Sequence, residues 1–382
     1  MLKTLKKNWV LISLVFLLIA LGMLFIYSAS SYSSGIKYDD SFYFVKKQLL
    51  GFGMGLVVML FFTMFDYHKF VKLRWVVVGI YISLLLLVFI PGIGRSNYGA
   101  NRWITIGGIS LQSSEVAKFG FVIFSACYLS KNYKKMKTFW GTIPLIAVGG
   151  ISCLLILLEP NLSVTLCLGT VMLIMLLIGG MQFKHFLFIL VPALCLVPIL
   201  IIIEPYRLQR LVAFIDPWAS PKEEGFQLIQ SLYALGSGGL FGVGLFNSRQ
   251  KYLFLPFSES DFIFSIIGEE LGFVGCIMII VIYAIVIWKG VKIAYSASDR
   301  LGCYMAGGIT SVIGVQLLIN IAVVTGSIPP TGIPLPFMSA GGTSLMVFMG
   351  AVGILLNISR KENQTVHSVF NKKHSSLVKG RA

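Results

Sequence analysis

Long runs of apolar residues, separated by short polar segments, make up most of the chain. A helix of about 20 apolar residues crosses the hydrocarbon core of a bilayer, and these runs reach or approach that length. An even number of crossings would put both ends of the chain on the same side of the membrane. We predict ten membrane-spanning helices, at residues 9–28, 48–65, 75–91, 114–130, 138–158, 162–180, 186–203, 261–288, 303–325 and 342–358.

Composition agrees with this pattern and indicates the fold class. Hydrophobic residues make up 57% of the chain, charged residues make up 12%, and the mean hydropathy is +0.86, far from the balance of a soluble domain. We expect an all-α, polytopic membrane protein in which residues 1–358 form one transmembrane domain. Residues 359–382 are polar and basic, and we expect them to form a disordered cytoplasmic tail.

The net charge of +16 is spread unevenly over the connecting segments. Twenty of the 31 lysines and arginines lie before the first predicted span, in the loops after the even-numbered spans, or after the last span. An excess of Lys and Arg marks the cytoplasmic side of a membrane protein, so both termini are expected in the cytoplasm. The chain shows no basic and aromatic nucleic-acid module, so nucleic acid is not an expected partner.

The segments on the other side of the membrane are longer and less regular. The longest is 204–260, and in it the spacing of Arg207 and Arg210 predicts an amphipathic helix at the membrane interface. The segment 326–344 holds four prolines. Non-helical backbone at membrane depth is tolerated only where it packs in protein or lines a cavity, so we predict a rigid re-entrant segment there.

Asp261 stands where a polar segment meets the eighth predicted span. A carboxylate at the membrane boundary costs solvation energy and is usually retained because it has a partner or a task. Asp261 is therefore the first place to look for chemistry. An aspartate before an apolar run can also cap the N-terminus of a helix, and the residues alone leave both roles open.

Four further charged residues lie at membrane depth. Glu115 and Lys118 share one face of the fourth span, where they can pair to fix helix packing or can line a cavity in which Lys118 faces an anionic substrate. Glu269 and Glu270 lie about two helical turns beyond Asp261. One of these two glutamates at most can share a cavity with Asp261, so we expect the other to hydrogen-bond a neighbouring helix.

Cysteine and histidine give no sign of a metal site or of disulfides. The six cysteines lie inside apolar runs without a C-x-x-C pair, and the four histidines lack ligand spacing. The cysteines are expected to be packing residues. A histidine-based metal site is not expected.

Four segments resemble the SEDS family (shape, elongation, division and sporulation), in the family's order and over nearly the whole chain. The sequences VVTG and LLNISR resemble the division and sporulation branch, FtsW and SpoVE, more than the elongation branch, RodA. The four segments are GANRWITIGGISLQSSEVAK, RLQRLVAFIDPWASPKEEGFQLIQSLYALGSGGLFGVGL, LPFSESDFIFSIIGEELG and NIAVVTGSIPPTGIPLPFMSAGGTSL.

The chain departs from the family pattern at a few positions. Ser113 stands where Pro is usual, Ala340 lies where SYGG is common, and EPN at 159–161, with Glu159 and Asn161, replaces QPD. Phe257 replaces the acid of the common LPE sequence. Glu259 can supply the carboxylate that is lost there.

The resemblance implies a peptidoglycan glycosyltransferase that polymerises lipid II on the outer face of the bacterial cytoplasmic membrane, for the division septum or the spore cortex. It implies that Asp261 is the base that takes the proton of the acceptor hydroxyl, and that cations stabilise the leaving lipid diphosphate while the donor linkage inverts. The only cofactor left open is a divalent cation, Mg²⁺ or Mn²⁺. The substrate-binding residues that we expect are Arg102, Glu115, Lys118, Arg249, Lys251, Glu259, Ser339 and Gly341.

The expected partners are lipid II, a class B penicillin-binding protein and other division proteins. Small residues in 302–314 permit close helix approach, so we place the transpeptidase against the eighth and ninth spans, near Gly307 and Gly308. Two alternatives are a lipid II flippase and a non-catalytic scaffold. We find no internal repeat of the kind common in transporters, and a scaffold leaves Asp261, Glu115 and Lys118 with packing roles alone.

Overall fold

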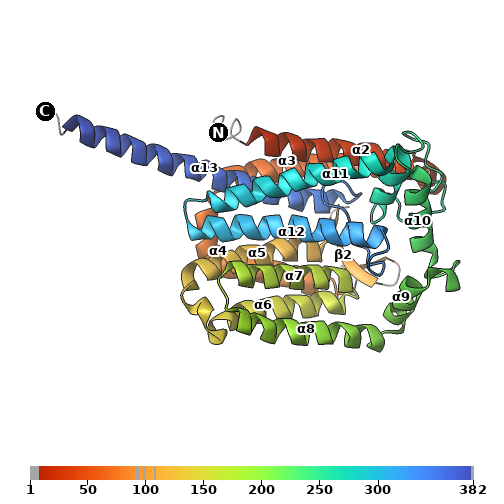
Figure 1. Cartoon of the computed structure of the whole chain (residues 1–382), viewed down its shortest axis with the longest axis horizontal. Coiled ribbons are helices and arrows are strands. Elements are labelled where there is room, and N and C mark those ends of the chain that lie inside the picture. The colour runs from red at the N-terminus through yellow and green to blue at the C-terminus, as the bar shows by residue number, and fades with distance from the viewer. Residues whose placement is uncertain (1–7, 92–93, 98–99, 107–108, 380–382) are drawn as a thin grey trace.

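The computed structural model describes residues 8–91, 94–97, 100–106 and 109–379. Over these residues ten long helices form a bundle, and Figure 1 shows that the first and the last of them reach the same end of the molecule. Each overlaps one predicted span, so the ten-helix architecture is confirmed. The helices are α2 (Trp9–Tyr38), α3 (Tyr43–Met64), α4 (Phe70–Leu87), α5 (Ser113–Asn132), α6 (Phe139–Leu158), α7 (Leu162–Ile178), α8 (Phe183–Ile203), α11 (Ile263–Tyr295), α12 (Arg300–Val324) and α13 (Gly342–Lys379).

Eight of these helices in the described part of the chain are long and apolar enough to cross a membrane. The other two are α7, which is apolar but only 17 residues long, and α5, which carries charged residues. Three short 3₁₀ turns are also present among the described residues. They are η1 (Tyr67–Lys69), η2 (Lys135–Lys137) and η3 (Pro217–Ala219).

The remaining elements lie at one end of the bundle, which we call the loop-rich end (right in Figure 1). They are the helices α9 (Pro205–Ile215) and α10 (Phe226–Gly238) and an antiparallel sheet of β1 (Gly94–Asn97), β2 (Ala100–Ile106) and β3 (Ile109–Gln112). Helix α9 is the amphipathic helix expected in 204–260. The sheet is an addition to the prediction, which treated 91–112 as a loop.

Burial separates the inner helices from the outer ones. Most of α5 is buried, as are large parts of α12 and of the first half of α13, whereas α8 has no buried residue. Helices α3 and α13 approach closely through glycines, because a Cβ on Gly51 would lie 2.2 Å from the Cα of Gly342. Small residues allow such contacts between helices in a membrane.

Helix α11 is broken at Gly272, whose backbone has φ 68° and ψ −167°. The segment 239–244 supplies hydrogen bonds at the break. Val243 N donates to Glu269 O at 2.9 Å, and Phe273 N donates to Gly239 O at 2.9 Å. The eighth predicted span is therefore two half-helices that meet at Gly272, and the segment 239–244 hydrogen-bonds to both of them.

Two helices are longer than predicted. Helix α2 continues to Tyr38, beyond the predicted end at residue 28, and α13 continues to Lys379, where we expected a disordered tail. Residues 354–379 contain neither proline nor glycine, and adding a residue to an existing helix costs far less than starting one. The spanning helix thus extends into the polar segment.

A partner contact at Gly308 is excluded by its burial, whereas a contact at the half-buried Gly307 stays a prediction. Gly308 is buried, and a Cβ there would lie 2.5 Å from Val122 Cγ1 and 2.7 Å from Met175 Sδ. Gly307 faces Ile178 at 3.5 Å. The face of α12 that carries Gly308 thus packs inside the protein against α5 and α7.

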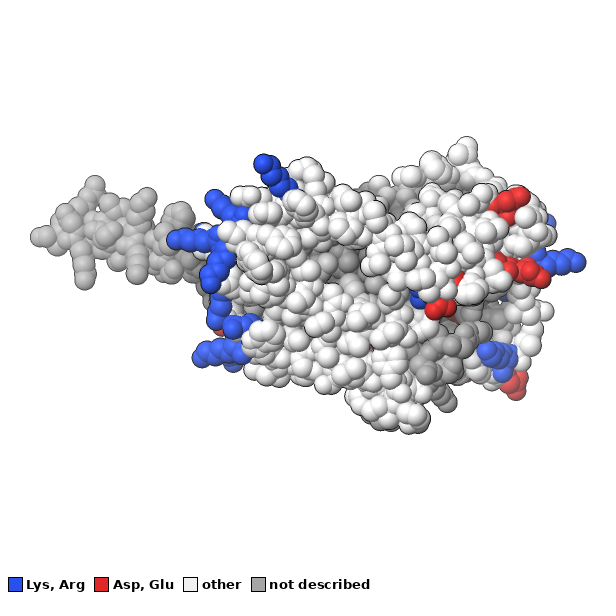
Figure 2. Space-filling model, turned by 90° about the horizontal axis from the view of Figure 1, so that it is seen from below, with Lys and Arg blue, Asp and Glu red and all other residues white. Residues whose placement is uncertain are grey.

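Charge divides the molecule along its length. Figure 2 shows lysines and arginines gathered at the end from which α13 leaves, which we call the basic end. The acidic side chains visible in that view lie mostly at the loop-rich end, mixed with a few basic ones. This is the asymmetry that the positive-inside rule describes.

Candidate functional site

Residues 326–341 leave α12 and turn back among the helices before α13 begins; we call them the proline segment. Proline has no N–H, so such a segment cannot form regular backbone pairs. Side chains bind its carbonyl groups instead, as expected for buried polar backbone. In order along the segment, Arg210, Ser163, Asn320, Gln316 and Tyr283 donate to the carbonyls of Pro330, Thr331, Ile333, Pro334 and Pro336.

The proline segment holds the backbone around Asp261. Ser339 Oγ donates to Ser260 O at 2.6 Å, and Ala340 N donates to Glu259 O at 2.9 Å. Asn320 Nδ2 donates to Asp261 O at 2.8 Å. These bonds fix the short stretch that presents the Asp261 carboxyl.

Asp261 does not cap α11. The N-cap position of that helix belongs to Phe262, and no side chain accepts a capping hydrogen bond there. The carboxyl instead lies beside Gly332, because a Cβ on that glycine would be 3.1 Å from Asp261 Oδ2. The capping interpretation is therefore wrong.

The electrostatics of the Asp261 carboxyl favour a proton acceptor that works near neutral pH. Its side chain keeps partial contact with solvent, yet burial among protein atoms raises its pKa to about 6. The nearby Glu259 carboxyl acts in the same direction, while Arg102 and Arg210 oppose the shift. Burial also raises the pKa of Glu259.

Two guanidinium groups act on this carboxyl from different elements. Arg102 extends from β2 and is anchored by Nε, which donates to Glu159 O at 3.2 Å. Arg210 extends from α9, lies 4.5 Å above the Tyr206 ring and donates from Nη1 to Pro330 O at 3.2 Å. The arrangement puts the Asp261 carboxyl under the electrostatic influence of two guanidinium groups. Arg102 was among the substrate-binding residues predicted from the sequence, whereas Arg210 was predicted only as part of the interfacial helix.

Glu115 and Lys118 form a fully buried pair at 2.8 Å. Lys118 also donates to Gln316, whose own amide donates to Pro334 O at 2.8 Å. Ser344 Oγ donates to Glu115 Oε2 at 3.3 Å. The pair is therefore linked through Gln316 to the proline segment. Contact between Lys118 and a substrate stays a prediction.

Ser339 and Gly341 belong to the same support. Gln48 of α3 donates to Ser339 O at 3.2 Å and accepts from Gly341 N at 3.0 Å. Both residues thus position the proline segment and, through Ser260, the neighbouring Asp261.

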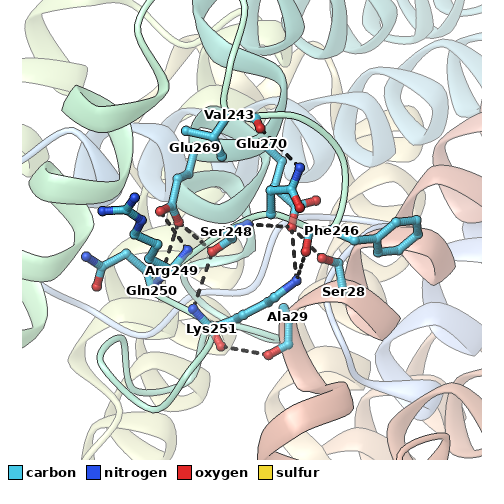
Figure 3. Close-up of polar contacts among 12 residues, drawn as sticks. Ser28, Ala29, Val243, Phe246, Ser248, Arg249, Gln250, Lys251, Glu269 and Glu270 are labelled. Carbon is cyan, nitrogen blue, oxygen red and sulfur yellow. Dashed lines mark hydrogen bonds and ion pairs between the residues drawn. The ribbon is translucent and has the colours of Figure 1, made fainter.

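Arg249 and Lys251 lie in a second polar group, shown in Figure 3. The Arg249 side chain is exposed, whereas its backbone N–H donates to Glu269 Oε1 at 2.9 Å. The Lys251 ammonium donates to Phe246 O and lies 3.8 Å from Glu270 Oε1. Neither side chain is among the groups that shift the pKa of the Asp261 carboxyl.

The two adjacent glutamates both serve this second group (Figure 3). Glu269 accepts from Ser248 Oγ at 2.5 Å, and Glu270 accepts from Ser28 Oγ of α2 at 2.5 Å. The expected bond to a neighbouring helix is present at Glu270. Neither glutamate reaches Asp261; together they clamp residues 248–251 onto α11.

Several buried oxygen atoms have no hydrogen-bond partner among the described residues. Buried polar atoms are nearly always paired, so these atoms indicate a place for a polar ligand or water. They are Thr105 Oγ1, Ser114 Oγ, Glu159 Oε2, Asn320 Oδ1 and Thr331 Oγ1.

Comparison with known proteins agrees with this architecture. "Stage V sporulation protein E" of Bacillus subtilis (strain 168) is 41% identical over 94% of this chain and 98% of its own. "Probable peptidoglycan glycosyltransferase FtsW" of Geobacter sp. (strain M18) is 37% identical over 93% and 97%. Both alignments run nearly end to end.

Solved structures share the fold. One chain of a peptidoglycan synthase complex, described for its coordination of polymerisation and crosslinking, matches with a TM-score of 0.74 and 26% identity over 93% of this chain and 98% of that one. Rod shape determining protein RodA of Thermus thermophilus matches with a TM-score of 0.67 and 23% identity over 93% and 97%. The model of the cell cycle protein family FtsW, RodA and SpoVE matches residues 8–364. The chain is therefore a member of the FtsW, RodA and SpoVE family of cell cycle proteins, the SEDS family.

Proposed function

We propose that the protein is a peptidoglycan glycosyltransferase that polymerises lipid II into glycan strands. The observation that carries this proposal is the Asp261 carboxyl, with a pKa near 6, beside the Arg102 and Arg210 guanidinium groups. A general base works best when its pKa lies near the operating pH. Two fixed cations suit a diphosphate leaving group. The relatives named peptidoglycan glycosyltransferase FtsW support the same activity.

The chemistry follows from these roles. The hydroxyl oxygen of the acceptor sugar forms a bond to the anomeric carbon of the donor, and its proton moves to the Asp261 carboxylate. The bond between that carbon and the diphosphate oxygen breaks, and Arg102 and Arg210 balance the charge of the departing lipid diphosphate. A single displacement of this kind inverts the donor linkage.

A metal would need ligands from the substrate. The described residues contain no group of three or more His, Cys, Asp or Glu side chains that could hold an ion. If Mg²⁺ or Mn²⁺ takes part, Glu259 and the phosphate oxygens of the substrate would hold it, and the ion would supply positive charge to the leaving diphosphate.

The proposed orientation places the loop-rich end outside the cell and both termini in the cytoplasm. The gathering of Lys and Arg at the basic end supports it. A class B penicillin-binding protein is the proposed partner, and the 26% identical chain from a synthase complex supports that choice.

The test is polymerisation of labelled lipid II by the purified protein, with and without a cognate transpeptidase. The Asp261→Asn variant should accumulate normally and lose about 10²–10⁴-fold in rate, because an amide cannot take the proton. The matched control is Asp216→Asn, at an exposed aspartate that accepts from Trp218 N at the start of η3 and can still do so as Asn. If Asp261→Asn polymerises within a few-fold of wild type, Asp261 is not the base. A flippase would move lipid II and make no polymer.

A further inference from the structure

Glu159 lies fully buried in the turn between α6 and α7. Ser113 Oγ donates to its Oε1 at 3.0 Å, and Arg102 Nε donates to its backbone carbonyl at 3.2 Å. No described residue hydrogen-bonds its Oε2. The Glu159 carboxyl is thus fixed through one oxygen, while its other oxygen has no hydrogen-bond partner among the described residues.

Burial raises the pKa of Glu159 to about 8, against smaller opposing effects of the Ser113 hydroxyl and the Arg102 guanidinium. The carboxyl therefore keeps its proton at neutral pH. Because Oε1 already accepts from Ser113, the O–H donor belongs on Oε2. Arg102 is the charged group that affects the pKa of Glu159. The pKa of Arg102 is affected in turn by Tyr206, Arg210 and Asp261.

The proton has an electrostatic consequence for Arg102. An ionised Glu159 next to the guanidinium would neutralise much of its charge. A neutral Glu159 leaves that charge available and adds a hydrogen-bond donor. A donor beside an uncompensated cation suits an anionic oxygen, and a buried donor without a protein partner is costly unless a ligand accepts from it.

We propose that Glu159 is a substrate-binding residue, a neutral acid that donates a hydrogen bond from Oε2 to a phosphate oxygen of the lipid diphosphate donor while leaving Arg102 free to bind its charge. This assignment rests on the proposed function. It adds a third group, after Arg102 and Arg210, to the recognition of the diphosphate.

The first test is the pH dependence of KM for labelled lipid II. In the wild type KM should rise about tenfold per pH unit above pH 8, as Glu159 loses its proton. Glu159→Gln keeps a neutral donor of the same shape, so its KM at pH 7 should stay within a few-fold of wild type and should not rise from pH 8 to 9. Ser113→Ala removes a hydrogen bond that lowers the pKa of Glu159, so it should move the rise to higher pH.

Three results would overturn the proposal: an alkaline rise in Glu159→Gln like that of wild type, a KM more than tenfold raised in Glu159→Gln at pH 7, or a wild-type KM in a folded Glu159→Leu variant. The last result would give Glu159 a packing role alone.

A second measurement does not depend on activity. Glu159 binds a proton more tightly in the folded protein than in the unfolded one, so its contribution to stability falls as pH rises from about 4.5 to 8. The melting temperature of wild type should therefore fall more steeply over this range than that of Glu159→Gln; parallel curves contradict the assigned proton. A long-chain polyprenyl diphosphate should raise the wild-type melting temperature more at pH 7 than at pH 9. No shift at either pH would refute diphosphate binding, whereas a shift without polymer formation would refute only the proposed activity.

Discussion

At the scale of single residues, the Asp261 carboxyl is tuned by neighbours with opposite effects. Burial is the largest influence and raises its pKa, Glu259 adds to the rise, and Arg102 and Arg210 oppose it. The balance leaves the pKa at about 6, so at neutral pH most of the carboxyl is ionised and able to accept a proton. Each neighbour therefore affects the pH at which Asp261, the proposed base, loses its proton.

The turnover rate should rise as the pH passes through about 6. Arg210→Gln removes a charge that lowers the pKa of Asp261, so the midpoint should move to higher pH. Glu259→Gln removes a charge that raises it, so the midpoint should move to lower pH. The control is Arg207→Gln, since Arg207 lies on the same helix but donates to Leu200 O. A pH–rate profile of kcat decides this, and an unmoved midpoint in Arg210→Gln would show that its guanidinium does not act on the base.

Sequence reasoning found some residues of this site and missed others for a physical reason. Asp261 was visible because a carboxylate at a membrane boundary is costly. Arg210 was not, since spacing places it on a helix face but cannot say what that face touches. Glu159 showed only as a departure from a family pattern, because its burial depends on α5 and β2, which are distant in sequence.

At the scale of elements, the break in α11 holds in place the chain segment that leads to Asp261. The first half-helix begins at Ile263, two residues after Asp261, and the segment 239–244 pairs with the break. Glu269 and Glu270, in the last turn before Gly272, clamp residues 248–251 (Figure 3). The segment before Asp261 is therefore tied to the helix after it.

Gly272→Ala should destabilise the protein. The φ and ψ of Gly272 are suited only to glycine, and another residue in that backbone conformation costs about 1–3 kcal/mol of stability. In addition, a Cβ at this position would lie 2.3 Å from Gly242 N. Gly236→Ala in α10 is the matched control, because nothing lies within 4 Å of its Cβ position. We expect a lower melting temperature in detergent for Gly272→Ala and an unchanged or higher one for Gly236→Ala; equal melting of the two variants would contradict the break.

Helices were easier to predict than the segments between them. Apolar runs such as 186–203 reveal a span directly, because the bilayer sets their length. Gly272 lies in the middle of the predicted span 261–288 and a single glycine does not end a helix pattern, so one unbroken helix was predicted. The sheet of β1–β3 was missed because its stability comes from pairing across 91–112, which apolar periodicity does not report.

At the scale of the whole molecule, charge separates the two ends. Basic residues gather where α13 leaves, and the site residues Asp261, Arg102 and Arg210 lie on elements of the opposite end. The lipid tail of a substrate would lie against the helices, and its sugar headgroup would contact the loops at the loop-rich end. Orientation in the membrane therefore decides which side of the cell the site serves.

Cysteine labelling tests this orientation. A cysteine in place of the exposed Glu223, in the segment between η3 and α10, should react with an impermeant maleimide on intact cells. A cysteine in place of the exposed Thr138, beside η2, should react only after the membrane is opened. The chain without either new cysteine is the control for its own thiols. Labelling of position 138 from outside would reverse the orientation.

The carbonyl groups of the proline segment have a consequence for how the protein is made. Their side-chain donors lie on α7, α9, α11 and α12, all of which leave the ribosome before the segment does. The donors are therefore already present in the growing chain when the proline segment is synthesised. A chain released before residue 326 would keep these donors but lack both their acceptors and the bonds from Ser339 and Ala340 that hold the backbone before Asp261.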